Sequence, residues 1–238
     1  MSRFGSIRAA VLTCGLLVLT SGLGGCSYNA YHEKQLGRAE MDQGAYAAAR
    51  ERFYEVTQQS RADWEGHYYL GLCDLELGEP VRAETALRQA LAVMDSSDQW
   101  TPRILDAVAQ SQYDQNEIDR LYAFLRAQID YYGTWHDYAR QARYLALVGD
   151  IDGAALAYRK AAYFSKNATE EIYIEIADFY ESIGDQPHAV QSLKWAYWIN
   201  PKHTQLPERF RKYGLVPGPT LREPPPTPAY AGDQLFAF

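Results

Sequence analysis

The sequence predicts an all-α fold in which about five helical hairpins stack into one solenoid. Two observations lead to this prediction. A pattern of small and apolar residues returns at intervals of about 34 residues along most of the chain. Within each copy the apolar residues have helical spacing. A repeat of this length is typical of stacked hairpins, which bury their apolar faces against their neighbours, and not of a globular enzyme core.

Each copy of the pattern has the same order of residue types. A small residue in the first helix precedes a turn glycine, and a second small residue, a large apolar residue and a final apolar residue follow in the second helix. The small residues allow close helix packing, and glycine tolerates the positive φ that reverses the chain. The four clear copies contain Gly37, Gly44, Ala49, Phe53 and Val56; Gly71, Gly78, Ala83, Leu87 and Ala90; Ala142, Gly149, Ala154, Tyr158 and Ala161; and Ala177, Gly184, Ala189, Leu193 and Ala196.

The pattern resembles the tetratricopeptide repeat (TPR). The Leu36-Gly37 pair, the turn glycine Gly44, the alanine Ala49 and the closing Pro201 fall at the offsets of that family. The resemblance implies a right-handed solenoid over residues 30–214. It also implies a concave groove, lined by the first helices of the hairpins, that binds a protein or peptide ligand.

Residues 98–134 have the length of one more hairpin but lack the clear pattern. Tyr113 stands where the turn glycine is expected, and Ile118 where the second small residue is expected. The segment is predicted to be a degenerate third repeat; the alternative is an irregular connection, which would be unusually long for a compact domain. Its helically spaced apolar residues are Leu105, Ala109, Tyr122 and Leu125.

The start of the chain has the features of a secretory leader. Arg3 and Arg8 precede a short apolar run, and Leu23-Gly24-Gly25-Cys26 follows it. This sequence resembles the bacterial lipobox, which implies that residues 1–25 are a signal peptide, that Cys26 is acylated, and that residues 26–29 form a lipidated linker. The alternative is an ordinary secretory signal with an incidental cysteine.

The predicted anchor also indicates a location. More than one acyl chain gives stable membrane attachment. Ser27 follows Cys26, whereas lipoproteins retained at the inner membrane often have an aspartate at this position. The resemblance therefore favours the bacterial cell envelope, with the protein attached to the outer membrane and facing the periplasm.

Composition and motifs argue against catalysis and nucleic-acid binding. The net charge of −7 is unfavourable for binding nucleic acid. The five histidines are scattered and form no metal-binding motif, and no phosphate-binding loop is present. We therefore expect a protein that is not an enzyme and uses no cofactor. Cys73 is expected to be a small buried hydrophobe, with a reactive thiol as the alternative.

The family resemblance places particular side chains in the concave groove. Lys34, Arg38, Arg103 and Arg143 are expected to meet an acidic segment of a partner, with Tyr68 and Trp100 as aromatic anchors. The alternative is that these are solvated charges and aromatic residues of the helix interfaces. The full set of predicted partner-binding residues is Tyr31, Lys34, Arg38, Tyr68, Leu72, Trp100, Arg103, His136 and Arg143.

The end of the chain has a different composition. Residues 204–213 are expected to form a helix that caps the last hairpin. Residues 215–238 are rich in proline and are predicted to be a disordered tail. Because Tyr230 and residues 235–238 are apolar, the alternative is a docking peptide, for a partner or for the protein's own groove.

These features together predict a non-enzymatic adaptor of the cell envelope. A lipid anchor would hold the groove at a membrane surface and raise the effective concentration of its ligand. The layout is similar to that of pilus and secretin pilot lipoproteins and of lipoproteins in outer-membrane barrel assembly. The alternative is an accessory subunit that recruits or regulates a peptidoglycan-processing enzyme.

Overall fold

The structure, a computed structural model, describes residues 29–95 and 99–226. The predicted signal peptide, the acylation of Cys26 and the apolar tip of the tail lie outside the described residues. The described part contains eleven α-helices and one short 3-10 helix, which confirms the all-α prediction. The helices are α1 (Ala30–Asp42), α2 (Tyr46–Gln59), α3 (Trp64–Glu76), α4 (Pro80–Val93), α5 (Thr101–Asp114), α6 (Ile118–Tyr131), α7 (Trp135–Leu147), α8 (Ile151–Ser165), α9 (Glu171–Ser182), α10 (Gln186–Ile199), α11 (Leu206–Lys212) and η1 (Pro219–Leu221).

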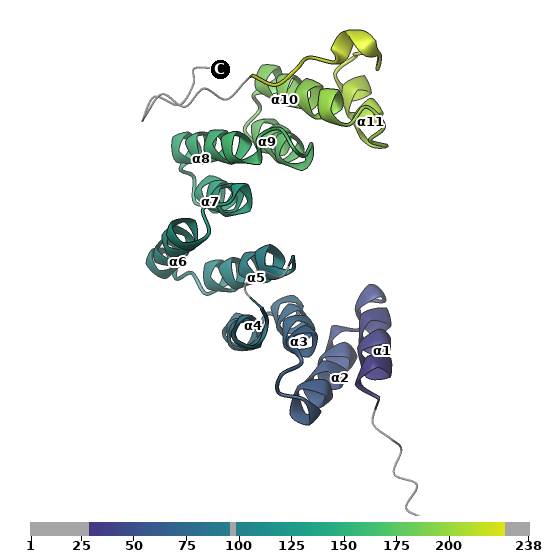
Figure 1. Cartoon of the computed structure of the whole chain (residues 1–238), viewed down its shortest axis with the longest axis vertical. Coiled ribbons are helices and arrows are strands. Elements are labelled where there is room, and N and C mark those ends of the chain that lie inside the picture. Colours follow the sequence, from purple (N-terminus) through teal and green to yellow (C-terminus); the bar gives the residue numbers. More distant parts are fainter. Residues whose placement is uncertain (1–28, 96–98, 227–238) are drawn as a thin grey trace, which may run out of the picture.

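The first ten helices form five consecutive antiparallel hairpins that follow a curved path (Figure 1). Each first helix contacts the first helix of the next hairpin, so that α1, α3, α5, α7 and α9 form one continuous row. Successive second helices make no such contacts with one another. The first helices therefore lie on the inner side of the curve, where the hairpins are closest together, and the second helices lie on the outer side.

The recurring small residues explain how the helices of a hairpin approach so closely. A Cβ atom added to Gly71 would lie 2.6 Å from the Cγ atom of Leu87, and one added to Gly37 would lie 2.7 Å from the ring of Phe53. Ala49 is fully buried on the facing helix. Gly44 ends the first hairpin's turn with a φ of +74°, a conformation that glycine adopts without strain.

The third repeat is a helical hairpin, α5 and α6, as predicted, but its register differs from the prediction. Asn116, with a φ of +58°, follows α5 at the place where Gly44 follows α1. The turn is thus centred at residue 116 and not at Tyr113. Asparagine tolerates the left-handed conformation better than most residues, so it replaces the expected glycine.

The corrected register moves the interior and the groove of the third repeat. Ala109 becomes the small residue of its first helix, and the fully buried Leu121 takes the place of the second small residue. Trp100 precedes α5 and does not lie on its inner face; its ring packs near Tyr68, with ring centroids 5.9 Å apart. A longer connection between α4 and α5 causes this shift, because it adds residues that the repeat interval does not contain.

A capping helix closes the last hairpin, as predicted. Leu206 and Phe210 of α11 are fully buried against the apolar cluster formed by the last two hairpins. The part of the tail up to residue 226 is also packed, in contrast to the predicted disordered segment. Leu221 packs on the same cluster, and Glu223 hydrogen-bonds to Gln191 and Lys194 of α10. These contacts attach the described part of the tail to α10.

Two further findings concern single features of the described residues. Cys73 is fully buried, as expected, and burial raises the pKa of its thiol to about 12. The thiol is therefore protonated at neutral pH and a poor nucleophile. None of the described helices combines the length and the apolar character that crossing a bilayer requires.

Candidate functional site

Ion pairs between neighbouring repeats occupy much of the inner surface. At its N-terminal end, Lys34 of α1 contacts Glu65 Oε2 at 2.6 Å and Asp63 Oδ2 at 2.9 Å. Arg38 contacts the other oxygen of Glu65 at 2.8 Å. Burial lowers the pKa of Lys34, but hydrogen bonds to Glu65 and Asp63 outweigh this effect and raise it above the ordinary value. These two predicted groove cations therefore connect α1 to α3.

The same arrangement recurs toward the C-terminal end. Arg143 of α7 contacts Asp106 of α5 at 3.1 Å and Glu175 of α9 at 3.6 Å. Arg209 of α11 contacts Asp178 of α9 at 2.7 Å. Each of these cations, on a first helix or on the cap, pairs with a carboxylate of an adjacent first helix. Three of the four cations predicted for the groove are thus paired with carboxylates of this chain, although the sequence predicted a groove that is basic in its first four repeats.

Arg103 is the exception among the predicted cations. Its side chain is exposed on α5, and no carboxylate of the described residues lies within ion-pair distance. The guanidinium carbon lies 4.8 Å from the centroid of the Trp100 ring. This cation–π contact orients the guanidinium while leaving its N–H groups accessible to a ligand.

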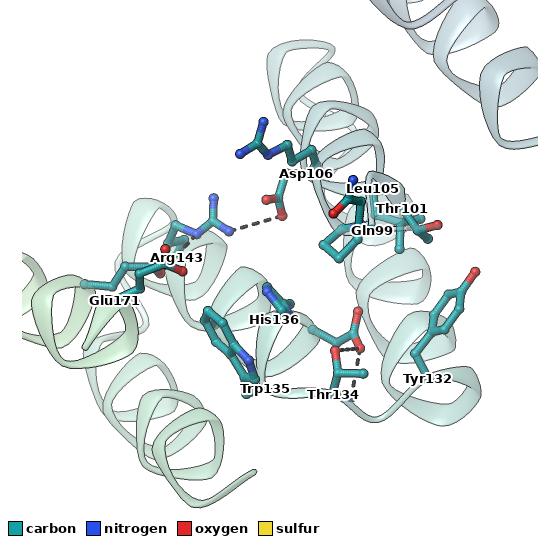
Figure 2. A pocket seen from close by; sticks show the side chains of 15 residues that line it. Gln99, Thr101, Leu105, Asp106, Tyr132, Thr134, Trp135, His136, Arg143 and Glu171 are labelled. Atoms are coloured by element: carbon teal, nitrogen blue, oxygen red, sulfur yellow. Dashed lines mark hydrogen bonds and ion pairs between the residues drawn. The ribbon is translucent and has the colours of Figure 1, made fainter. Parts of the chain in front are cut away.

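A cleft of about 640 Å³ lies between α5, α7 and α9, next to Arg103. Figure 2 shows Asp106 and Arg143 on one side of this cleft and Trp135, His136 and Tyr132 on another. This volume lies within the range of pockets that hold small ligands or short peptide segments. The lining residues are Gln99, Thr101, Pro102, Arg103, Leu105, Asp106, Tyr132, Thr134, Trp135, His136, Asp137, Ala139, Arg143, Glu171 and Glu175.

A buried arginine fixes one wall of the cleft. Arg140 is fully buried, and its guanidinium donates to Asp106 at 2.5 Å, to Asp137 at 2.9 Å and to the carbonyl oxygen of Pro102 at 3.1 Å. Asp137 also closes the capping box at the start of α7 with Thr134. Arg140 thus joins α5 to α7 and holds Asp106, the carboxylate of α5 that also contacts Arg143.

The uncharged part of the cleft is formed by a pair of stacked rings. The rings of Trp135 and His136 lie 3.7 Å apart at an interplanar angle of 26°. Burial lowers the pKa of His136, so the imidazole is neutral at pH 7. Burial also raises the pKa of Glu175, although Arg143 acts in the opposite direction. The cleft therefore offers an uncharged aromatic surface together with an exposed cation, Arg103, and an exposed acid, Glu171, among its lining residues.

The structure separates the predicted binding residues into three places. Arg103, His136 and Arg143 line the cleft. Tyr68, Leu72 and Trp100 belong to one apolar cluster between α3, α4 and α5, in which Tyr68 is only 8% exposed. The remaining three residues lie on α1, at the far end of the row: Tyr31, Lys34 and Arg38. The side chain of Tyr31 is exposed.

Sequence reasoning missed Asp106, Arg140 and Asp137, which build the cleft wall. Asp106 was not predicted as an inner residue of α5, because the turn of the third repeat was predicted at Tyr113 and not at Asn116. Arg140 escaped notice because a charged residue is seldom fully buried. One signal could have identified Asp106 and Arg140 as partners. They are 34 residues apart, which equals the repeat interval and places them on neighbouring first helices. Over the described residues, no cluster of three or more histidine, cysteine or acidic side chains could hold a metal ion.

The stacked hairpins and the row of first helices define a helical-repeat scaffold. The family model of the tetratricopeptide repeat matches residues 40–101. The chain is similar to the crystal structure of TTC0263, a thermophilic TPR protein in Thermus thermophilus, with a TM-score of 0.57 and 18% identity over 79% of this chain and 100% of that chain. Residues 40–101 therefore match the tetratricopeptide repeat, and the described part of the chain has a TPR-like fold.

Two other solved structures are similar at lower scores. The MamA protein has a TM-score of 0.48 and 19% identity, over 80% of this chain and 98% of that chain. YrrB, a TPR protein with an unusual peptide-binding site, has a TM-score of 0.44 and 12% identity, over 79% of this chain and 93% of that chain. No curated protein sequence matches this chain significantly. The matched repeat is a scaffold fold that is typical of protein–protein interaction.

Proposed function

We propose that this protein is an adaptor of the bacterial cell envelope whose cleft between α5, α7 and α9 binds an extended segment of a partner protein. The observation that carries this proposal is the exposed guanidinium of Arg103 at the edge of a cleft whose other lining arginine, Arg143, is held by carboxylates of this chain. Repeat scaffolds use such inner surfaces to hold extended ligands. Arginine and tryptophan are also enriched among the residues that dominate binding energy at protein interfaces.

The chemistry of the cleft narrows the kind of segment that fits it. Arg103 favours a carboxylate, which a guanidinium can bind with two parallel hydrogen bonds. The stacked rings of Trp135 and His136 favour an apolar or aromatic side chain. Lys34, Arg38 and Arg143 already hold carboxylates of this chain, so a run of acidic residues would have to compete with those ion pairs. The proposed ligand therefore has one acidic residue close to an apolar one.

The membrane anchor is a second part of the proposal, and the sequence at the start of the chain supports it. Acylation of Cys26 would leave only three residues before α1 begins at Ala30. At about 3.5 Å per residue, this linker would keep α1 within roughly 15 Å of the membrane surface. The adaptor would then present its partner close to the outer membrane, facing the periplasm, which is consistent with a role in envelope assembly. Attachment also raises the effective concentration of the captured partner.

The cleft is tested by in-cell crosslinking with the variant Arg103→Glu and the matched control Arg126→Glu. Arg126 is an exposed arginine on α6, the second helix of the same hairpin, and lies outside the cleft. Reversing the charge at Arg103 should remove the main crosslinked partner, while Arg126→Glu should retain it. Equal recovery of that partner by both variants would place recognition on another surface.

The anchor is tested separately by Cys26→Ala. If Cys26 is acylated, this variant should move from the membrane fraction to the soluble fraction after cell lysis, because multiple acyl chains give stable attachment. An unchanged membrane fraction would refute the anchor. The proposal for the cleft would not be affected by that result, because Arg103 binds its ligand whether or not the chain is attached to a membrane.

A further inference from the structure

A second, apolar pocket lies on the outer side of the solenoid, between the last two hairpins. Its volume is about 280 Å³, and it is formed by α8, α9 and α10. Its walls carry the rings of Tyr158, Tyr180 and Trp195. Because successive second helices do not contact one another, α8 and α10 leave this space open above α9. It is separate from the cleft between α5, α7 and α9, with which it shares no lining residue.

The described part of the tail runs toward this pocket. Arg222 lies over the ring of Tyr197, with its guanidinium carbon 5.5 Å from the ring centroid. The next residue, Glu223, accepts hydrogen bonds from Lys194 at 2.7 Å and from Gln191 at 2.9 Å. The tail thus advances toward the N-terminal end of α10, which is the end that lines the pocket. Gln191 belongs to both places, since it also lines the pocket.

The sequence beyond the described tail supplies suitable side chains. Pro225 is still buried, and the chain continues for twelve residues after Pro226. Those residues include Leu235-Phe236-Ala237-Phe238, the most apolar run in the second half of the tail. The ten residues from Pro226 to Phe236 could span roughly 33 Å when extended. This reach is ample, because Glu223 already contacts a residue of the pocket.

Charge around the pocket is compatible with the same segment. Arg159 and His188 line the pocket with Tyr158 and Trp195. The only charged side chain between Pro226 and Phe238 is that of Asp233, which one residue separates from the apolar run. A carboxylate at that place would come near Arg159 when the aromatic side chains enter the pocket.

We infer that the pocket between α8, α9 and α10 binds the apolar segment 235–238 of the same chain. Binding within the chain is favoured because a short linker gives an effective concentration in the millimolar range, well above that of a second copy. The segment would cover the apolar rings on the outer side of the last repeats. The inference does not depend on the proposed ligand of the inner cleft.

The experiment places the photoreactive residue p-benzoylphenylalanine at position 236 of the purified full-length protein. After irradiation at low micromolar concentration, crosslinked peptides are identified by mass spectrometry. Crosslinks within one chain to the peptides that contain α8 and α10 are expected. Crosslinks that join two chains, crosslinks to the inner cleft, or no crosslinks at all would overturn the inference.

Two variants and a control test whether the pocket itself is responsible. Ala155→Trp should fill the pocket and reduce the crosslinking yield about fivefold or more, because it displaces the apolar side chains from their contacts. Leu156→Trp is the matched control, since Leu156 is the next residue on α8, is exposed and lies outside the pocket. Phe238→Asp changes only the tail, leaves the solenoid sequence intact and should also reduce the yield. Equal yields from Ala155→Trp, Phe238→Asp and the control would overturn the inference.

Discussion

Replacement of the buried arginine at the wall of the cleft should weaken the junction between the third and fourth repeats. The variant Arg140→Met keeps a long, flexible side chain and removes the positive charge. Asp137, whose side chain is only 3% exposed, would then retain Thr134 as a hydrogen-bond partner but lose its ionic one. Asp106 would keep its contact with Arg143. The main loss is therefore expected at Asp137.

The size of the effect follows from the burial of these groups. Removing one partner of a buried ion pair leaves an uncompensated charge and costs about 3–5 kcal/mol. The carbonyl oxygen of Pro102 loses one hydrogen bond, for which about 1 kcal/mol is typical. Asp106 is one-third exposed, so water can replace part of its loss. We expect Arg140→Met to lower the free energy of unfolding by roughly 4–6 kcal/mol.

The assay is urea unfolding followed by circular dichroism, with two comparison variants. Arg143→Met removes a cation that is 38% exposed, so it should cost less than about 1 kcal/mol. Arg140→Met combined with Asp137→Asn removes both charges of the pair and should recover about 1–2 kcal/mol of the loss. The unfolding transition of Arg140→Met should also broaden, because a solenoid with one weak junction unfolds less cooperatively.

A small effect would refute this reasoning. If Arg140→Met were as stable as Arg143→Met within about 0.5 kcal/mol, the carboxylates of the cleft wall would not depend on the buried arginine. The cleft would then owe its shape to apolar packing alone. Failure of Asp137→Asn to recover stability would contradict the assignment of the main loss to that carboxylate.

Three further predictions concern the packing, the thiol and the stacked ring. Gly71→Ala gains about 1 kcal/mol in helix propensity, but its methyl group is forced against Leu87 at a cost of about 1–3 kcal/mol. Urea unfolding should therefore show a net loss of stability of about 1 kcal/mol. A variant more stable than the wild type would show that the contact with Leu87 relaxes freely. At pH 8 a thiol with a pKa of about 12 is ionised to roughly one part in ten thousand. Maleimide should therefore label Cys73 on the order of a thousandfold more slowly in the folded protein than in the urea-unfolded protein. Comparable labelling rates would mean that the hairpin of α3 and α4 opens in the folded state. Burial lowers the pKa of His136 in the folded state, so the unfolded state takes up a proton first and stability should fall as the pH decreases below 6.5. The variant His136→Gln should lack this part of the pH dependence of the melting temperature. Identical pH profiles for the variant and the wild type would refute the lowered pKa of His136.

The extent to which the sequence predicted the fold depended on the repeat pattern. Gly37, Gly71 and Ala49 were predicted as interface residues, and the structure places them where the two helices of a hairpin meet. In the third repeat the absence of the glycine removed the reference point for its register. Asn116 fills the same conformational role, but asparagine is common in many other positions and gives a weak signal.

The site was predicted less completely, because it depends on which helices become neighbours. The inner positions of the first helices were predicted from the family, and Arg103, His136 and Arg143 indeed line the cleft. Their charge balance was not predicted. Arg143 lies between Asp106 and Glu175, which come from two other repeats 37 and 32 residues away in sequence, and no local pattern indicates that they converge.

The sequence by itself determined the all-α repeat fold, because helical apolar spacing within a repeat of about 34 residues produces hairpins that bury their apolar faces by stacking on their neighbours. It also determined the burial of Cys73, which lies on the apolar face of its helix. Only the tertiary structure decided which cations remain accessible. Ion pairing is governed by distances between side chains on different helices, and those distances follow from the stacking of the repeats. For this reason Arg103 is accessible, whereas Lys34, Arg38 and Arg143 are held by carboxylates of this chain.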